Sequence, residues 1–156
     1  ACARQAAGAA GLQYVLKLTK SLHPEAPHMV DNAATPTSAV QNDFTTTVGA
    51  LRTQVADFVA ARDWSGFHSP KNLAMSIAIE AAEIMEHFQW YTAAESAERM
   101  QDEALRAEMA DEVADVIIYC LSLANSTGMD VSHAVRTKLA RNEGRFPVER
   151  VRGKLG

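Results

Sequence analysis

The stretch IEAAEIMEHFQW, residues 79–90, decides the fold, because it combines an apolar helical stripe with two carboxylates. Glu80 and Glu83 are spaced so that a helix places them on one face, one turn from each other. Ile84 and Phe88 continue the apolar stripe on the adjoining face. The two acidic side chains therefore border the surface that we expect to be buried, and they do not lie opposite it.

A second stretch, DEVADVIIY at residues 111–119, repeats this arrangement. Glu112 and Asp115 have the same spacing, Val116 belongs to the neighbouring apolar face, and Tyr119 lies one turn beyond Asp115. If the two helices pack along their apolar stripes, both acidic faces come together. The sequence thus predicts one site built from carboxylates on two helices.

Four carboxylates in a partly buried site repel one another, and burial disfavours their charged form. A hard divalent cation relieves both effects, and ligands that offer only oxygen suit Mg²⁺, with Mn²⁺ as an alternative. We therefore expect Glu80, Glu83, Glu112 and Asp115 to hold Mg²⁺. A single acidic pair is common on solvated helix faces, but two pairs beside two apolar stripes arise by chance much less often.

Composition limits the class of protein. The chain has 156 residues, of which 47% are hydrophobic and 22% charged, as in an ordinary single-domain globular protein. Its net charge of −4 argues against a nucleic acid polymer as a partner. No apolar run approaches the ~20 residues of a membrane span. Cys2 and Cys120 are far apart, which favours a reducing, cytoplasmic compartment, and we expect Cys120 to lie in the core.

The chain divides into three parts. Residues 1–42 are expected to form a flexible N-terminal arm, with a short amphipathic helix at 12–22 and a proline-containing linker after it. This arm shows no convincing apolar segment of a targeting peptide, and its His28-Met29 pair resembles a cloning junction, so one hypothesis is that part of it is vector-derived. Residues 43–150 form the predicted helical domain, and residues 151–156 a C-terminal tail.

Helical periodicity covers most of this domain, and no segment shows convincing strand alternation with hairpin turns. The expected helices span residues 44–62, 70–90, 92–100, 102–125 and, from 130 or 132, to 142, before an extended tail at Phe146-Pro147. The residues expected to start helices are Asn42 or Asp43, Ser69 with Pro70, and Thr92. Gly128 and Gly144 are expected to end them. The fold class is all-α, a four-helix bundle or close to it.

Aromatic side chains on both sides of the first acidic helix favour a pocket for a nucleobase. Trp64 and His68 lie in the loop before the helix, and Trp90 ends it. An aromatic plane stacks on a base with about 1–3 kcal/mol. Either tryptophan alone is better explained as core filler, but two that flank a carboxylate helix favour the pocket. Tyr119 either bonds a ligand or lies at the edge of the bundle.

Basic and amide groups gather near the C-terminus. Lys138 and Asn142 are one turn apart on the last predicted helix, and Arg145 follows them. Lysine is a mobile point charge suited to phosphate, and arginine offers a planar fork. Alternatively, these groups form a solvated helix end where cations interact with the helix dipole, which is the better explanation for any one of them alone. His87 more readily satisfies a neighbouring carboxylate than binds a metal.

Three blocks are specific as a set: RDWSGFHSPKNLAMSIAIEAAEIMEHFQW (62–90), EMADEVADVIIYCLSLA (108–124) and TKLARNEGRFPVE (137–149). Together they resemble the all-α nucleoside triphosphate pyrophosphohydrolases of the MazG-like superfamily, especially its single-domain dCTP pyrophosphatase branch. The resemblance implies that the predicted domain is a Mg²⁺-dependent enzyme that cleaves a (d)NTP to a monophosphate and pyrophosphate. It also implies an intertwined dimer or dimer of dimers, with sites near subunit boundaries.

The resemblance implies roles for single residues. The family's metal ligands match Glu80, Glu83, Glu112 and Asp115, and its base, sugar and phosphate contacts match Trp64, His68, Trp90, Tyr119, Lys138 and Asn142. Lys138 and Arg145 are expected to offset charge on the leaving pyrophosphate. Val55 stands where some relatives have a histidine, and Phe146 where others have a tyrosine, so base selectivity stays open. A dNTP such as dCTP or a modified pyrimidine nucleotide is the expected substrate, and nucleotide-pool control (house-cleaning) the expected role.

Two alternatives come from other classes of protein. A carboxylate-bridged di-iron bundle needs an ExxH motif on each of two helices. Here Glu83 and His87 are too far apart for that motif, and the second acidic stretch has no histidine. A non-catalytic helical oligomer or partner-binding module explains the apolar stripes, but it leaves the two tryptophans and Lys138 unrelated to any ligand.

Overall fold

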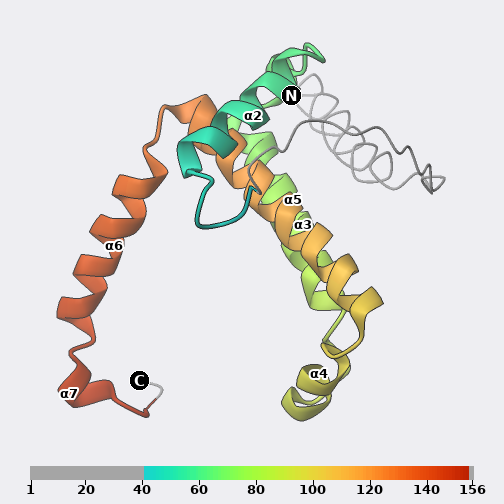
Figure 1. The fold of residues 1–156 in the computed structure, drawn as a ribbon. Coiled ribbons are helices and arrows are strands. Elements are labelled where there is room, and N and C mark those ends of the chain that lie inside the picture. Colours follow the sequence, from blue (N-terminus) through green and yellow to red (C-terminus); the bar gives the residue numbers. More distant parts are fainter. Residues whose placement is uncertain (1–40, 155–156) are drawn as a thin grey trace, which may run out of the picture.

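The computed structural model describes residues 41–154, and its regular elements are all helical. They are, in chain order, α2 (Val48–Ala60), the 3₁₀ helix η1 (Ser65–Phe67), α3 (Pro70–Glu86), α4 (Ala93–Arg99), α5 (Glu103–Thr127), α6 (Val131–Arg145) and α7 (Val148–Val151) (Figure 1). No strand occurs within residues 41–154, so the predicted all-α class is confirmed. The helix expected at residues 12–22 lies outside the described residues.

Local capping explains most of the helix ends. The Ser69 hydroxyl accepts a backbone N–H at 3.3 Å, and Pro70 takes the first position of α3, as predicted. Thr92 and Glu95 form a reciprocal capping box at the start of α4. α5 ends at Gly128, as predicted, and the left-handed φ of 67° at this residue explains the choice of glycine.

The first helix begins later than expected. α2 starts at Val48, and its cap is Thr47, whose hydroxyl accepts the Ala50 N–H at 3.1 Å. Asn42, one of the two predicted caps, instead closes a separate turn, in which its side-chain oxygen accepts the Phe44 N–H at 2.9 Å. Several polar residues near a helix start compete for the capping role, and the periodicity of the apolar residues does not decide between them.

Two other helices also differ in length from the prediction. α3 stops before the predicted end at Trp90, because the chain turns there through bonds such as Phe88 N–H to the Met85 carbonyl oxygen at 3.0 Å. α6 runs through Gly144, the predicted stop, since a glycine inside a helix costs only about 1 kcal/mol. Residues 148–151, predicted to be extended, form the short α7.

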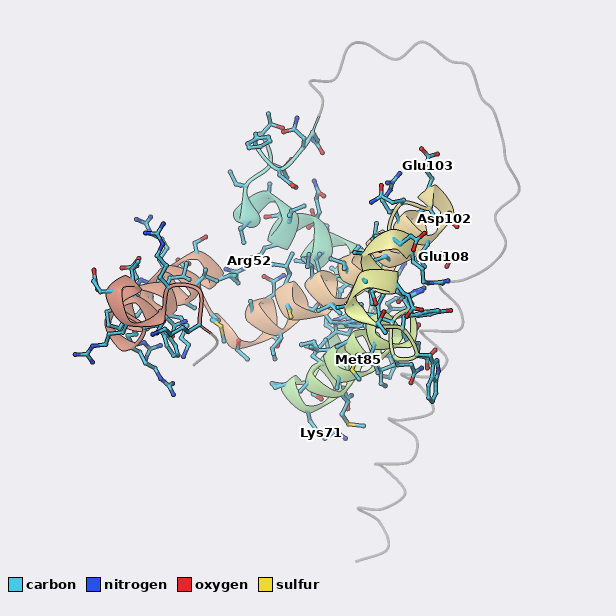
Figure 2. All side chains as sticks on the ribbon, turned by 90° about the horizontal axis from the view of Figure 1, so that it is seen from below. Arg52, Lys71, Met85, Asp102, Glu103 and Glu108 are labelled. Carbon is cyan, nitrogen blue, oxygen red and sulfur yellow. The ribbon has the colours of Figure 1, made fainter. Side chains whose placement is uncertain are left out.

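α5 is the central helix of the protomer. α3 and α5 lie side by side and antiparallel, with α4 in the connection at one end (Figure 1). α2 packs on α5, so that α5 lies between α2 and α3 (Figure 2). Arg52 of α2 donates from Nε to Asn125 Oδ1 at 2.9 Å, and Asn125 Nδ2 donates to the Arg52 carbonyl oxygen at 2.9 Å. The buried apolar residues come from α3 and α5 and include Leu73, Leu105, Met109, Leu121 and Ala124.

α6 stands away from the α3–α5 pair in both views (Figures 1 and 2). It contributes no buried residue, and its Val135 and Leu139 are 51% and 56% exposed. Cys120, predicted to be in the core, is exposed on α5, because no helix within the described residues 41–154 covers it. None of the described helices is both long and apolar enough to span a bilayer.

Candidate functional site

The α3–α5 pair brings carboxylates from two helices together. One oxygen each of Glu80, Glu112 and Asp115 lies within 4.8 Å of the other two. Glu80 is 2% exposed and Glu112 6% exposed, whereas Asp115 is half-buried. Three acidic groups that are so close and so weakly hydrated repel one another. The carboxylate cluster, defined by these three residues, is therefore a place for positive charge.

Glu83, the fourth predicted ligand, lies one turn along α3 from Glu80 and is half-buried. It is not part of the carboxylate cluster. The donors of the cluster are carboxylate oxygens only, and no histidine or cysteine belongs to it. Hard cations such as Mg²⁺ and Mn²⁺ prefer this donor set, whereas a structural zinc site or a di-iron bundle uses nitrogen or sulfur as well. The residues present thus fit a hard divalent cation.

A cavity of about 460 Å³ opens beside the cluster, between α2, the loop after it and α5. Asp115 and Tyr119 line this main cavity from α5, so Asp115 belongs both to the cavity and to the carboxylate cluster. The other walls are mostly apolar or aromatic and include Leu51, Val55, Phe58, Val59, Trp64, Ile117 and Ile118. The site therefore joins an acidic end to an apolar end, as a ligand with a charged part and a flat apolar part requires.

Two aromatic rings form one wall of the main cavity. Phe58 and Trp64 pack edge to face, with ring centroids 6.0 Å apart and planes at 73°. Arg62 lies over the Phe58 ring, with its guanidinium carbon 3.5 Å from the ring centroid, and donates to the Phe58 carbonyl oxygen at 3.1 Å. The wall is thus held in place by contacts within the protomer.

His68 lines the same cavity directly after the 3₁₀ helix. Its backbone N–H donates to the Ser65 carbonyl oxygen at 3.2 Å, and Asn72 of α3 donates to the Phe67 carbonyl oxygen at 2.9 Å, which ties the loop to α3. Burial lowers the pKa of His68 below its ordinary value of 6.5, so the imidazole is neutral at neutral pH. A neutral imidazole offers one hydrogen-bond donor and one acceptor.

A smaller cavity of about 260 Å³ shares four wall residues with the main one: Val55, Val59, His68 and Ser122. Sequence reasoning missed Ser122 as a site residue. One signal was available, because Ser122 lies one turn beyond Tyr119 on α5 and so shares the face that carries the predicted site. Phe58 also lines the main cavity, and it was not among the predicted site residues.

Four predicted site residues lie elsewhere in the protomer. Trp90 is 84% exposed in the turn after α3 and does not line the main cavity. Lys138, Asn142 and Arg145 are on α6, away from the α3–α5 pair (Figure 1). Within one protomer, therefore, the structure brings together Trp64, His68, Tyr119 and the carboxylate cluster, but not the cations of α6 or the second tryptophan.

Comparison with known proteins assigns the chain to a family. The sequence profile of the MazG-like family matches residues 75–153. dCTP pyrophosphatase 1 of Rattus norvegicus is 37% identical over 107 residues, which cover 69% of this chain. The Homo sapiens protein of the same name is 36% identical over 106 residues, which cover 68% of this chain. The crystal structure of a pyrophosphatase from Archaeoglobus fulgidus is 37% identical, with a TM-score of 0.60, and the match covers 64% of this chain and 91% of that one.

Fold and site together define an all-α protein with an acidic centre between two antiparallel helices. The chain belongs to the MazG-like family, and its relatives in the dCTP pyrophosphatase branch agree with the resemblance of its motifs. The matched region spans 63% of the length of the rat relative and 62% of the length of the human one.

Proposed function

We propose that the chain is a nucleoside triphosphate pyrophosphohydrolase, which converts a (d)NTP and water to a (d)NMP and pyrophosphate. One observation carries the proposal: Asp115 belongs both to the buried carboxylate cluster and to the wall of the aromatic cavity. A nucleoside triphosphate has the matching two parts, since its polyphosphate binds through divalent cations and its base is flat and stacks on aromatic rings.

The proposed substrate is a dNTP such as dCTP or a modified pyrimidine nucleotide. The names of the rat and human relatives support this choice. The cellular role that follows is control of the nucleotide pool. A cytoplasmic location stays a prediction from the sequence.

In this proposal Glu80, Glu112 and Asp115 hold Mg²⁺ or Mn²⁺, with Glu83 as the fourth ligand. Such an ion, when bound, supplies Lewis acidity for the phosphate oxygens, an activated water and a template for in-line attack. One of the four carboxylates accepts the proton of the water that attacks the α-phosphorus. The carboxylates of α3 and α5 thus fix the end of the site where the phosphates lie.

The walls of the main cavity hold the nucleoside. Trp64 presents an aromatic ring to the base, and neutral His68 offers it a donor and an acceptor. Tyr119 lies one turn beyond Asp115, and its place on α5 directs it to the part of the ligand between the phosphates and the base. The mostly apolar walls cover part of the base, and a hydrogen bond made against them is stronger than one made in water.

A second copy of the chain completes the site in this proposal. α6 exposes Val135 and Leu139 one turn apart, and such apolar surface is typical of an interface. A homodimer, or a pair of dimers, in which α6 packs on the partner buries this surface and forms the four-helix arrangement between subunits. Lys138 and Arg145 then reach the partner's carboxylates and offset charge on the leaving pyrophosphate.

In the same dimer Asn142 contacts the sugar or phosphates, and Trp90 adds a second ring to a base pocket. Both residues lie outside the main cavity of their own protomer. Trp90 exposes most of its surface, and exposed aromatic surface is typical of an interface.

The direct test incubates the chain with canonical and modified dNTPs and NTPs at one Mg²⁺ concentration and measures pyrophosphate and monophosphate. We expect equal amounts of both products from at least one pyrimidine dNTP and none in EDTA. Release of orthophosphate would contradict attack at the α-phosphorus. Absence of any product would favour the non-catalytic module, and colour that depends on iron would favour the di-iron bundle.

A further inference from the structure

Ser122 breaks the usual pattern of a serine inside a helix. Its side chain is buried, with only 4% of the residue exposed, and Oγ has no hydrogen-bond partner in the described structure. Ser76, which is equally buried on α3, instead donates to the Asn72 carbonyl oxygen one turn earlier at 3.2 Å. A buried hydroxyl without a partner is unfavourable, because it has lost its bonds to water and gained none. A buried serine at this position is therefore better explained by a role in ligand binding than by a contribution to stability.

Ser122 lines both the main cavity and the smaller one, at the wall that they share. The residues around it on this wall are Val55 and Val59, which offer no hydrogen bonds, and His68. Ser122 is thus a polar residue in a mostly apolar wall of the main cavity. Such a small number of polar groups in an apolar cavity is the usual means by which a binding site fixes the orientation of its ligand.

The position of Ser122 along α5 relates it to the carboxylate cluster. Asp115 and Ser122 lie two helical turns apart on the same face, which corresponds to about 10 Å along the helix axis. Tyr119 lies between them and lines the same cavity. This separation is comparable to that between the α-phosphate of a nucleotide and the polar edge of its base. A ligand whose phosphates meet Asp115 therefore brings its base to Ser122.

We infer that Ser122 is a specificity-determining residue, whose hydroxyl bonds to the polar edge of a pyrimidine base in the main cavity. The inference rests on the proposed function. A hydroxyl both donates and accepts, so it pairs with a ring carbonyl or with an exocyclic amine. A base that offers no such group opposite Ser122 leaves the hydroxyl buried and unsatisfied, and this cost is the source of the selectivity.

A purely structural role makes the opposite prediction for stability. If Ser122 served the fold, its replacement by alanine would destabilise the free protein. If Ser122 serves the ligand, Ser122→Ala removes an unsatisfied buried hydroxyl and leaves the free protein at least as stable as the wild type. Ser76→Ala is the matched control, because it removes a buried hydroxyl that is already satisfied and lies outside the lining of both cavities.

The experiment compares the wild type, S122A and S76A as full chains. kcat and KM are measured for the panel of dNTPs with Mg²⁺, and the thermal midpoint is measured without nucleotide. For S122A we expect kcat/KM to fall about tenfold for the preferred pyrimidine dNTP, mainly through KM, and about twofold or less for the poorest substrate. The thermal midpoint of S122A should equal or exceed that of the wild type. S76A should keep the wild-type order of substrates and melt at a lower temperature.

The outcomes separate the two proposals. An active wild type whose S122A variant keeps the same preference among bases overturns the role of Ser122 and leaves the proposed function intact. A lower thermal midpoint of S122A, with an equal loss for all nucleotides, assigns the hydroxyl to the fold and also overturns the inference. A wild type that releases pyrophosphate from no nucleotide overturns both.

Discussion

Glu80 of α3 and Glu112 of α5 are almost fully buried, and each places a carboxylate oxygen within 4.8 Å of the other and of Asp115. Two helices that are separated by a connection through α4 (Figure 1) thus meet at their acidic residues, in a core that is mostly apolar. Ionised carboxylates at such a short distance repel one another in a medium of low dielectric constant, and a bound cation offsets this repulsion. We therefore interpret these three carboxylates as a cation site.

Replacement of one member of the pair tests this interpretation. Glu112→Gln keeps the shape of the side chain but removes one charge. We expect turnover to fall by at least about 100-fold, since even residues that only support a metal ligand account for 10- to 100-fold effects. In EDTA the variant should melt no lower than the wild type, because repulsion is reduced. The rise in thermal midpoint on addition of Mg²⁺ should disappear. Full turnover of the variant in excess Mg²⁺ would contradict the metal site.

The contacts between Arg52 and Asn125 predict how α2 is held on α5. Asn125→Ala removes both hydrogen bonds and leaves a part-buried guanidinium and a carbonyl oxygen without their partner. We expect the free energy of unfolding to fall by about 1–3 kcal/mol. KM should rise as well, because Val55, Phe58 and Val59 of α2 form cavity walls. Denaturant unfolding and steady-state kinetics measure the two effects.

Asn125→Asp is the control for this change. Its carboxylate still accepts from Arg52 Nε but cannot donate to the Arg52 carbonyl oxygen, so the loss of stability should be smaller than for Asn125→Ala. An equal or larger loss for Asn125→Asp would show that repulsion between its carboxylate and the Arg52 carbonyl oxygen outweighs the bond from Arg52 Nε.

Features that depend on residues close together in the sequence were predicted better than features that depend on distant residues. The helix period and the capping residues act within one or two turns, and they located α3 and α5 with their acidic faces correctly. The convergence of Glu80, Glu112 and Asp115 followed from packing the two apolar stripes together. By contrast, the start of α2 depended on a competition between Thr47 and earlier polar residues, which periodicity does not decide.

Residues whose surroundings come from distant parts of the chain were harder to predict. Cys120 was expected in the core from its hydrophobic neighbours, yet it is exposed, because an apolar neighbourhood in sequence does not determine which face of α5 another helix covers. The position of Ser122 one turn beyond Tyr119 indicates the face it lies on, but the two cavities that it lines depend on the packing of α2 against α5. The proposed roles of Trp90 and Lys138 depend on a second protomer, whose position helix periodicity and capping residues do not predict.

The lowered pKa of His68 predicts a dependence of stability on pH. Burial disfavours the imidazolium in the folded protein, whereas the unfolded chain protonates with the ordinary pKa of 6.5. The unfolded state therefore binds more protons than the folded state once the pH falls below that value, and stability decreases from there toward the folded-state pKa. Above this window the contribution of His68 is constant.

His68→Gln should remove this part of the pH dependence. Denaturant unfolding of the wild type and the variant on both sides of the window measures the effect. We expect the wild type to lose more stability than the variant as the pH falls through the window. Parallel curves for the two proteins would mean that His68 is as well hydrated in the folded protein as in the unfolded chain.

Gly128, directly after α5, and Gly144, within α6, should respond to replacement by alanine in opposite directions. Gly128 has a left-handed φ of 67°, which costs a residue with a Cβ about 1–2 kcal/mol, so Gly128→Ala should lower the free energy of unfolding by that amount. Gly144 lies within α6, and a Cβ there meets nothing within 4 Å, so Gly144→Ala should raise it by up to about 1 kcal/mol. Unfolding at a fixed protein concentration measures both changes. A loss of stability in Gly144→Ala would indicate a close neighbour from a second protomer.

The proposal that two protomers share each site can be tested by mixing two inactive variants. Glu112→Gln disables the carboxylates and keeps α6 intact, whereas Lys138→Ala keeps the carboxylates and lacks the cation. If Lys138 serves the partner's carboxylates, a mixed dimer contains one site with both defects and one site with none. After unfolding and refolding together in equal amounts, half of the dimers are mixed, so about a quarter of the wild-type activity should return.

Each variant refolded alone is the control, and light scattering verifies the dimer. If a verified mixed dimer regains no activity, each protomer uses its own Lys138 or none, and the shared site is excluded.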